Sequence, residues 1–318
     1  MKRRGNQGTE AARRKKPKLE DFSDATMEST GVRRSMKDAR YRMLAVDLDG
    51  TLLDRSGKPH ARDIAALRAL VAAGGIVTIV TGRLFAGTRE AAELIGIRGP
   101  VACADGSHLV DAETGATLQH HGIDKNRSDV LRGALRTHGL ATFVFKHNAI
   151  VHDARGDAFL PYVQMWSNQI ERTEEVWNHG AFRSGDVTAV VALGSETDVT
   201  SVVAHVRNNT LPSLQMATFA IQRLGELWGF IARADSVSKG TALGWLANHH
   251  KCTVKEIVCV GDWLNDLPMM SVAGRSFAMG QSPAEVKAAA TDVLPETSAQ
   301  GGGIARVVEE VFGVTVDE

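Results

Sequence analysis

Short apolar runs rich in β-branched residues alternate with stretches of helical periodicity along most of this chain. Near the beginning, the runs Met43–Val46 and Ile76–Val80 are separated by Arg62–Ala73, in which apolar residues recur at helical spacing. Gly74 and Gly75 follow directly and end that helical segment. A strand, a helix and a second strand in this order predict a βαβ unit with parallel strands.

The next segment predicts a second helix, a further strand and an antiparallel hairpin. The helix spans Ala86–Ile95, and the apolar run Pro100–Ala104 predicts the strand. The hairpin strands are His108–Val110 and Ala116–Leu118, joined by a turn around Gly115. These elements continue the first module.

From about residue 122 to residue 230 the pattern changes to several short strands with helices between them. This pattern indicates a second α+β module inserted into the first. The predicted strands are Ala141–Phe145, Ala149–His152, Val187–Leu193, Met216–Gln222 and Trp228–Ile231, and the predicted helices are Ser128–His138 and Thr197–Asn208.

Beyond Lys239 the alternation of strands and helices returns. Thr241–His249 predicts a helix and Glu256–Val260 a strand, and two more helices are predicted over Pro283–Ala290 and Gly303–Phe312. The chain therefore predicts an α/β fold whose first module is completed only after the inserted one.

Two carboxylates, Asp47 and Asp49, follow the first strand directly. If the extended geometry persists to Asp49, both point toward one spot at the carboxyl end of the strand, where open α/β sheets bind ligands. Two acids at one spot repel, so a shared proton or a cation must hold them together, and oxygen ligands favour Mg²⁺. The alternative is an acidic strand-to-turn junction, because Asp and Gly are common in turns.

Polar residues also follow the second strand and precede a later helix. Thr81 and Gly82 end the strand Ile76–Val80, and a hydroxyl beside a free backbone N–H can hold phosphate oxygens. Lys239 precedes the helix Thr241–His249 and can neutralise a phosphate. The alternatives are an ordinary turn at Thr81 and a solvated lysine at the helix start.

The strand Glu256–Val260 ends in a third group of oxygen-bearing side chains, Asp262, Asn265 and Asp266. Such side chains suit an Mg²⁺ site, although the same residues also suit the capped start of a helix. Four such segments in order, each at a strand end or a helix start, are hard to explain by chance.

These segments resemble the four motifs of the haloacid dehalogenase (HAD) superfamily, and the chain is most similar to its Cof-like phosphatases. Asp47 to Thr51 matches the Asp-x-Asp-Gly-Thr motif, and Thr81 matches the second motif in its Thr-Gly-Arg form. Lys239 in Ser-Lys-Gly matches the third. Gly261, Asp262, Asn265 and Asp266 match the fourth, Gly-Asp-x-x-Asn-Asp.

The resemblance extends from about residue 41 to the C-terminus and implies a domain organisation. A Rossmann-like parallel-sheet HAD core is expected over residues 41–121 and 232–318, with an α+β cap domain over residues 122–231. One departure stands out: Cof-like proteins often carry Asn-Gly-Ala after the second motif, where this chain has Asp105-Gly106-Ser107.

The resemblance also implies a role for each motif residue. Asp47 is the nucleophile that forms an aspartyl-phosphate, and Asp49 is the acid and base for the leaving group and the attacking water. Thr81 and Gly82 bind the phosphoryl oxygens, together with Lys239.

The expected metal ligands for Mg²⁺ are Asp47, Asp262 and, through its backbone carbonyl, Asp49. Asn265 and Asp266 are expected to support this site. Arg83 either touches the substrate or makes a structural ion pair.

Composition fits an ordinary soluble protein, with 43% hydrophobic and 23% charged residues. No apolar run approaches the roughly 20 residues of a membrane span, and the charged N-terminus lacks a signal-peptide core. We therefore expect a cytoplasmic protein with no membrane partner. The cysteines Cys103, Cys252 and Cys259 lack metal-like spacing and are interpreted as free thiols. The neighbouring histidines His120-His121 and His249-His250 also lack ligand spacing and are interpreted as surface residues.

Net charge is zero over the chain but is unevenly distributed. Residues 1–40 contain 12 Lys or Arg and 6 Asp or Glu, and few large apolar residues. We interpret this segment as a disordered basic tail. Its run from Arg13 to Lys18 matches nucleic-acid-binding and nuclear-localisation patterns, but a solvated tail is the preferred interpretation, so a nucleic-acid partner is not expected.

The leading hypothesis is an Mg²⁺-dependent phosphatase acting on a small phosphorylated metabolite, with sugar phosphates as the expected class. A hexose phosphomutase, or a phosphatase specific for trehalose or sucrose phosphate, is the enzymatic alternative. A nucleic-acid-associated protein that uses the basic tail is the alternative outside enzymology. The sequence indicates neither the individual substrate nor the oligomeric state.

Overall fold

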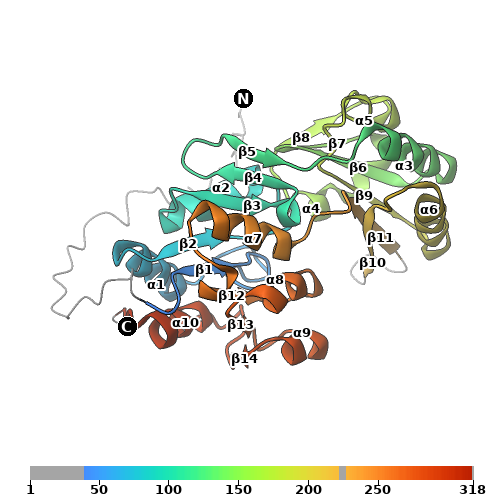
Figure 1. Cartoon of the computed structure of the whole chain (residues 1–318). Helices are drawn as coiled ribbons and strands as arrows, with labels where there is room; N and C mark the ends of the chain where they lie inside the picture. The colour runs from blue at the N-terminus through green and yellow to red at the C-terminus, as the bar shows by residue number, and fades with distance from the viewer. Residues whose placement is uncertain (1–38, 222–226, 317–318) are drawn as a thin grey trace, which may run out of the picture. The chain divides into compact units, whose positions relative to one another are not determined.

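The computed structural model describes residues 39–221 and 227–316, coloured from blue to red along the chain in Figure 1. The expected basic tail, residues 1–40, lies almost entirely outside the described residues, and so does Gln222 at the end of one predicted strand. No helix in the described ranges combines the length and hydrophobicity that crossing a membrane requires.

A parallel sheet of five strands forms the first module, in the order β14-β13-β12-β1-β2. Its strands are β1 (Met43–Val46), β2 (Ile76–Ile79), β12 (Ile257–Gly261), β13 (Arg275–Ala278) and β14 (Asp292–Val293). β1 lies between β12 and β2, and Val46 is in register with both Val260 and Ile79. The carboxyl ends of these three strands therefore meet at one edge, and the predicted parallel βαβ unit is confirmed.

Both faces of this sheet are buried, and β1 supplies side chains to each. Leu44 and Val46 belong to the same buried cluster as α1 (Ala61–Ala72) and α10 (Gly303–Phe312). Met43 and Ala45 belong to the cluster that contains α7 (Lys239–His249). A strand buried on both faces carries an unbroken apolar run, as this one does. The module's other helical elements are α2 (Phe85–Ile95), α8 (Leu267–Val272), α9 (Ala284–Ala289) and the 3₁₀ turns η3 (Ala104–Gly106), η7 (Val254–Glu256) and η8 (Leu264–Asp266).

A small antiparallel sheet continues from the end of β2. It contains β3 (Pro100–Cys103), β4 (His108–Asp111) and β5 (Thr117–His120), in that order. β3 is joined to the segment after β2 by a parallel bridge between Val80 and Ala102. The predicted hairpin is confirmed, and it leads into the inserted module.

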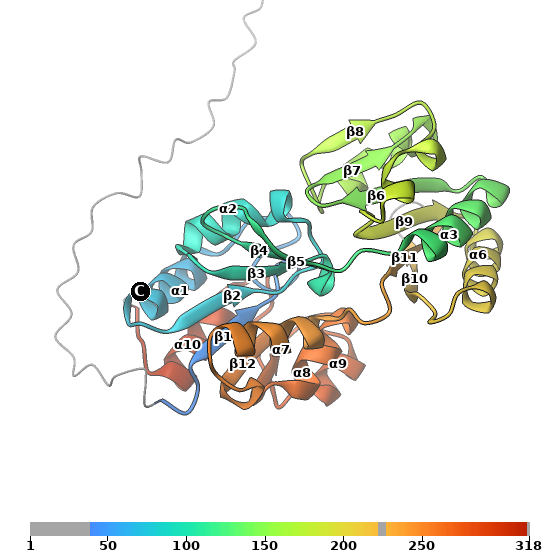
Figure 2. The ribbon, with the colours of Figure 1, turned by 45° about the horizontal axis from the view of Figure 1, so that its top comes forward.

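The inserted module is built on a six-stranded sheet in the order β10-β11-β9-β6-β7-β8. Its strands are β6 (Ala141–Lys146), β7 (Ala149–His152), β8 (Ile170–Arg172), β9 (Ala189–Gly194), β10 (Gln215–Ile221) and β11 (Leu227–Arg233). Figure 2 shows α3 (Lys125–His138) and α6 (Glu196–Asn209) along one face of this sheet. The short elements are α4 (Leu160–Val163), α5 (Ala181–Ser184), η4 (Ala154–Phe159) and η5 (Val176–Asn178).

Local capping explains where the two long helices of this module begin. The Asp124 side chain accepts a hydrogen bond from the backbone N–H of Arg127, 3.1 Å away, and Ser195 does the same for Asp198 at 3.1 Å. Side-chain acceptors at these positions satisfy backbone donors that have no partner within the helix. The expected α/β class with an inserted α+β module is confirmed.

Three histidines from separate elements gather where the hairpin meets the inserted sheet. His108 on β4, His120 on β5 and His147 in the turn after β6 have ring centroids 4.6 to 5.6 Å apart. Burial and the nearby imidazoles lower the pKa of His108 to about 4, and burial with the charge of His147 lowers that of His120 to about 4. His120 is therefore half-buried rather than freely exposed as expected, because His108 on β4 and His147 after β6 pack against its ring.

Candidate active site

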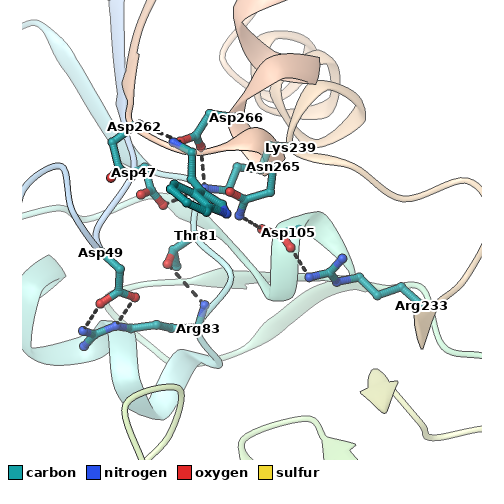
Figure 3. Close-up of polar contacts among 11 residues, drawn as sticks. Asp47, Asp49, Thr81, Arg83, Asp105, Arg233, Lys239, Asp262, Asn265 and Asp266 are labelled. Carbon is teal, nitrogen blue, oxygen red and sulfur yellow. Dashed lines mark hydrogen bonds and ion pairs between the residues drawn. The ribbon is translucent and has the colours of Figure 1, made fainter. Parts of the chain in front are cut away.

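Asp47 is held at the carboxyl end of β1, and the chain turns away immediately after it. The backbone N–H of Asp47 still pairs with the carbonyl of Val260 on β12 at 3.0 Å. Backbone hydrogen bonds from Thr51 and Leu53 to the carbonyl of Leu48 then close a tight turn. The extended geometry therefore does not persist to Asp49, and that part of the expectation is wrong. The two carboxylates have different partners (Figure 3).

Lys239 is the partner of Asp47. Its ammonium Nζ donates to Oδ1 of Asp47 and to Oδ1 of Asp266, both at 2.6 Å, and the lysine side chain is fully buried. Burial disfavours the charged ammonium, but the carboxylates of Asp266 and Asp47 outweigh it and raise the pKa of Lys239. The side chain is thus a buried cation between two acids, positioned at the first turn of α7 by the Ser238 cap, whose Oγ accepts from the N–H of Thr241 at 3.1 Å.

Asp262 completes a group of carboxylates. Oxygen atoms of Asp47, Asp262 and Asp266 lie within 4.8 Å of one another, and among the described residues no other such group of three potential metal ligands occurs. Burial raises the pKa of Asp47 well above its usual value, and burial with the charge of Asp266 raises that of Asp262 to about 7. Oδ1 of Asp262 is buried without a hydrogen-bond partner. Three acids against one ammonium, with an oxygen left over, fit a hard divalent cation.

Asp266 shapes the loop that carries Asp262. Its Oδ2 accepts from the backbone N–H of Asp262 at 2.8 Å and of Trp263 at 3.0 Å, while Oδ1 faces Lys239. A Cβ on Gly261 would overlap the Asp266 side chain, which explains a glycine at the end of β12. Asp266 is therefore the residue that connects the lysine to the backbone of the acidic loop.

A second glycine explains how closely the first and last motifs approach. Gly50 has φ +80°, and a Cβ there would overlap the carboxylate of Asp262. The side-chain amide of Gln281 donates to the carbonyl of Gly50 and, at 3.3 Å, to Oδ2 of Asp262. Gln281 was not predicted, because nothing in its local sequence marks it.

Arg83 forms an ion pair with the carboxylate of Asp49. Its Nε donates to Oδ2 at 2.8 Å and a terminal nitrogen contacts Oδ1, so the ion pair is bidentate. The backbone N–H of Arg83 donates to Oγ1 of the buried Thr81 at 3.2 Å. Of the two roles considered for Arg83, the structure contains the ion pair.

Asp105 lies beside the predicted phosphate-binding residues and links two further side chains. Its Oδ1 accepts from Nδ2 of Asn265 at 2.9 Å, and its Oδ2 forms an ion pair with Arg233 (Figure 3). A Cβ on Gly82 would lie 3.4 Å from Oδ1 of Asp105. The fold thus places every predicted site residue around one edge of the core sheet. Arg233 was missed, because an arginine at the end of a strand carries no motif.

Comparison with known proteins places these residues in a family. A family profile described as haloacid dehalogenase-like hydrolase matches residues 44–308. Phosphatase YwpJ of Bacillus subtilis is 27% identical over 285 residues, covering 79% of this chain and 94% of the relative. HMP-PP phosphatase of Yersinia enterocolitica is 27% identical over 259 residues, covering 78% and 86%.

Solved structures share the fold across both modules. A haloacid dehalogenase-like hydrolase from Bacteroides thetaiotaomicron superposes with a TM-score of 0.73 at 20% identity, covering 86% of this chain and all of the other. The sugar phosphatase BT4131, of HAD subclass IIB, superposes with a TM-score of 0.69 at 19% identity, covering 86% and 99%. These structures show the same fold, and the family match over residues 44–308 shows that the chain belongs to the haloacid dehalogenase-like hydrolases.

Proposed function

We propose that this protein is an Mg²⁺-dependent phosphatase that hydrolyses small phosphorylated metabolites, with sugar phosphates as the first class to test. The observation that carries the proposal is a buried arrangement: Asp47 and Asp262 follow the adjacent parallel strands β1 and β12, and Lys239, at the start of α7, contacts Asp47. The relatives named as phosphatases support the reaction class. One of them is named for HMP-PP and the other for no particular substrate, so they support no single metabolite.

Asp47 is the proposed nucleophile. Lys239 holds its Oδ1, which fixes the orientation of the carboxylate at the strand end. Attack on phosphorus forms an aspartyl-phosphate and releases the alcohol. The carboxylate and the phosphate repel each other, so the reaction needs added positive charge beyond that of Lys239.

Mg²⁺ is the proposed source of that charge. Asp47, Asp262 and the backbone carbonyl of Asp49 would hold the ion, which when bound would neutralise the phosphate and lower this repulsion. Asp266 supports the arrangement through the N–H groups of Asp262 and Trp263. Asn265 supports it from the same loop.

Asp49 and the second motif complete the proposed chemistry. Asp49 protonates the leaving oxygen and then takes a proton from the water that attacks the aspartyl-phosphate. Arg83 orients that carboxylate through its two-point contact. Thr81 Oγ1 and the N–H of Gly82 bind the phosphoryl oxygens, and Lys239 offsets charge as the bond to the leaving group breaks.

A substrate panel tests this proposal. The purified protein is assayed with p-nitrophenyl phosphate and a set of sugar phosphates, with Mg²⁺ and with EDTA. We expect Mg²⁺-dependent release of phosphate, and a loss of several orders of magnitude in turnover for Asp47→Asn, because an amide is a poor nucleophile. Near-normal turnover in that variant would rule out the covalent route. A requirement for a hexose bisphosphate activator, with isomerised product, would favour the phosphomutase instead.

A further inference from the structure

Asp105 lies where three segments of the chain meet, and the proposed mechanism gives it no role. Its side chain is 5% exposed, and the chain passes through it in the left-handed region, with φ 53°. An aspartate tolerates this conformation better than most residues, but it remains uncommon outside glycine. The backbone therefore accounts for an aspartate or an asparagine here, but it does not require a charged carboxylate.

Each oxygen of this carboxylate serves a different part of the fold. Oδ1 accepts from Asn265, which lies in η8 between Asp262 and Asp266. Oδ2 pairs with Arg233, the last residue of β11, from which the chain returns to the core. An asparagine offers only one acceptor oxygen, so it could satisfy one of these two donors and would turn an NH₂ group toward the other.

The backbone around Asp105 is tied to the phosphate-binding turn as well. The N–H of Asp105 donates to the carbonyl of Thr81, and the N–H of Ala104 donates to the carbonyl of Arg83, both at 2.8 Å. Asp105 thus contacts the Thr81 turn through its backbone and the acidic loop, residues 261–266, through Oδ1. Through Oδ2 it contacts β11 of the inserted six-stranded sheet, called the cap sheet below.

The Arg233 side chain has little alternative to this contact. It is 11% exposed, and its Nε is buried without a hydrogen-bond partner. Removing the partner of a buried charge is strongly destabilising, so loss of the Asp105 contact would leave the Arg233 guanidinium unfavourably buried.

We propose that Asp105 is a positioning residue that couples the end of the cap sheet, at Arg233, to the acidic loop that carries Asp262. This inference rests on the proposed function and extends it to a residue pair outside the four motifs. Movement of the cap strand is transmitted to the ion-binding loop through the two oxygens of one carboxylate. A change at Arg233 therefore alters the loop of Asp262, although Arg233 does not touch it.

Three variants separate this coupling from general destabilisation. Asp105→Asn removes the acceptor oxygen that faces Arg233. Arg233→Gln removes the cationic partner and leaves the Asp105 carboxylate intact. In the double variant, the side-chain oxygen introduced at position 233 can accept from the amide introduced at position 105. Asp292→Asn makes the same substitution in a more exposed ion pair, with Arg275 at 2.7 Å between β13 and β14, and is the control outside the proposed coupling. Unfolding curves establish that each variant is folded before it is compared.

The main readouts are Mg²⁺ binding by calorimetry and amide hydrogen exchange over residues 261–266, neither of which depends on turnover. We expect Arg233→Gln and Asp105→Asn each to weaken Mg²⁺ binding about tenfold and to speed exchange in that loop. The double variant should lose less than the product of the two single effects. The control should match the parent protein.

Unchanged Mg²⁺ binding and loop exchange in Arg233→Gln would overturn the coupling, as would independent effects in the double variant. If Asp105→Asn does not fold, Arg233→Gln alone decides the matter. In the substrate assay we expect both single variants to have a lower kcat, with a proportionally smaller change in KM. The reason is that the pair of Asp105 and Arg233 acts on the loop of Asp262 and not on the substrate. If the parent hydrolyses no substrate in the panel, the proposed function fails, while calorimetry and exchange still test the coupling.

Discussion

Arg83 holds both carboxylate oxygens of Asp49, so the proposed proton carrier has a defined orientation before any substrate binds. The guanidinium is also anchored to the carbonyl of Gly87 by Nη1 at 3.3 Å. Lysine has no planar fork and cannot reproduce the two-point contact.

We therefore expect Arg83→Lys to keep the charge and lose much of the rate. Its kcat should fall about 10- to 100-fold, less than the roughly 10²–10⁴-fold that a whole acid and base group contributes, because Asp49 itself remains, and KM should change less. Steady-state kinetics with p-nitrophenyl phosphate measures both constants. Asp49→Asn should be slower still. If Arg83→Lys turned over at the parental rate, the proposal that the Arg83 guanidinium orients Asp49 would be refuted.

Gly50→Ala should abolish the Mg²⁺ response, and Gly57→Ala should not. Both glycines have similar positive φ angles, +80° and +78°, so both substitutions carry a similar backbone cost of about 1–2 kcal/mol. Only at Gly50 does the added methyl meet the Asp262 carboxylate; at Gly57 nothing lies within 4 Å. Calorimetric Mg²⁺ titration of the two variants, with urea unfolding, separates the steric effect from the backbone effect. Equal Mg²⁺ affinity in both would contradict the packing described at Gly50.

Asp262→Asn should stabilise the metal-free protein while it removes metal binding. Burial first, and then the charge of Asp266, raise the pKa of Asp262 from 3.8 to about 7. Above pH 7 its ionised form is less favourable in the folded than in the unfolded chain, so the carboxylate lowers the free energy of unfolding there. We expect a gain of about 1–3 kcal/mol at pH 8 in EDTA, and no added stability from Mg²⁺. Urea unfolding with and without Mg²⁺ provides the measurement. If Asp262→Asn were less stable than the parent in EDTA, the ionised Asp262 carboxylate would not be destabilising the folded chain.

The histidine cluster should make the protein less stable as the pH falls below neutrality. The pKa values of His108 and His120 are about 4 in the folded chain, below the ordinary value of 6.5. Between these values the unfolded chain binds protons that the folded chain does not, so each histidine lowers stability by up to about 1.4 kcal/mol per pH unit. Their contribution is absent above about pH 7 and complete near pH 4.

Asp262 acts in the opposite direction over the same range, because its raised pKa makes the folded chain the better proton acceptor. The test is therefore the difference between the parent and His108→Gln, measured by urea unfolding from pH 7.5 to pH 5. We expect the variant to lose less stability than the parent over this interval. Parallel curves would mean that His108 takes up its proton as readily when folded as when unfolded.

The three central core strands β1, β2 and β12 were predictable because burial on both faces of the sheet gives each of them an unbroken apolar run. Met43–Val46 and the strand ending at Gly261 are apolar runs followed by acids, and the structure contains them as β1 and β12. β14 was missed because its two residues are too few to form a pattern. β8 was missed because its three residues are half-buried or exposed and show no alternation.

Side chains that meet across long stretches of chain were predictable only where a motif marked both partners. Lys239 and Asp47 each carry such a mark, and the fold brings them together. Arg233 and Asp105, like His108 and His147, become neighbours through the packing of separate sheets. Periodicity describes one element at a time, so such pairs require the three-dimensional structure.

The order of the strands has a consequence for how the chain is made. β1 needs β12 beside it, and more than two hundred residues of translation separate them, whereas the six strands of the inserted sheet are contiguous in the chain. We expect the insertion to fold first, on the ribosome, before the segment that carries Asp262 has been synthesised and can pack beside Asp47. Ribosome-bound chains whose insertion has emerged before β12 should then contain a protease-resistant insertion, while the core residues that precede it remain accessible.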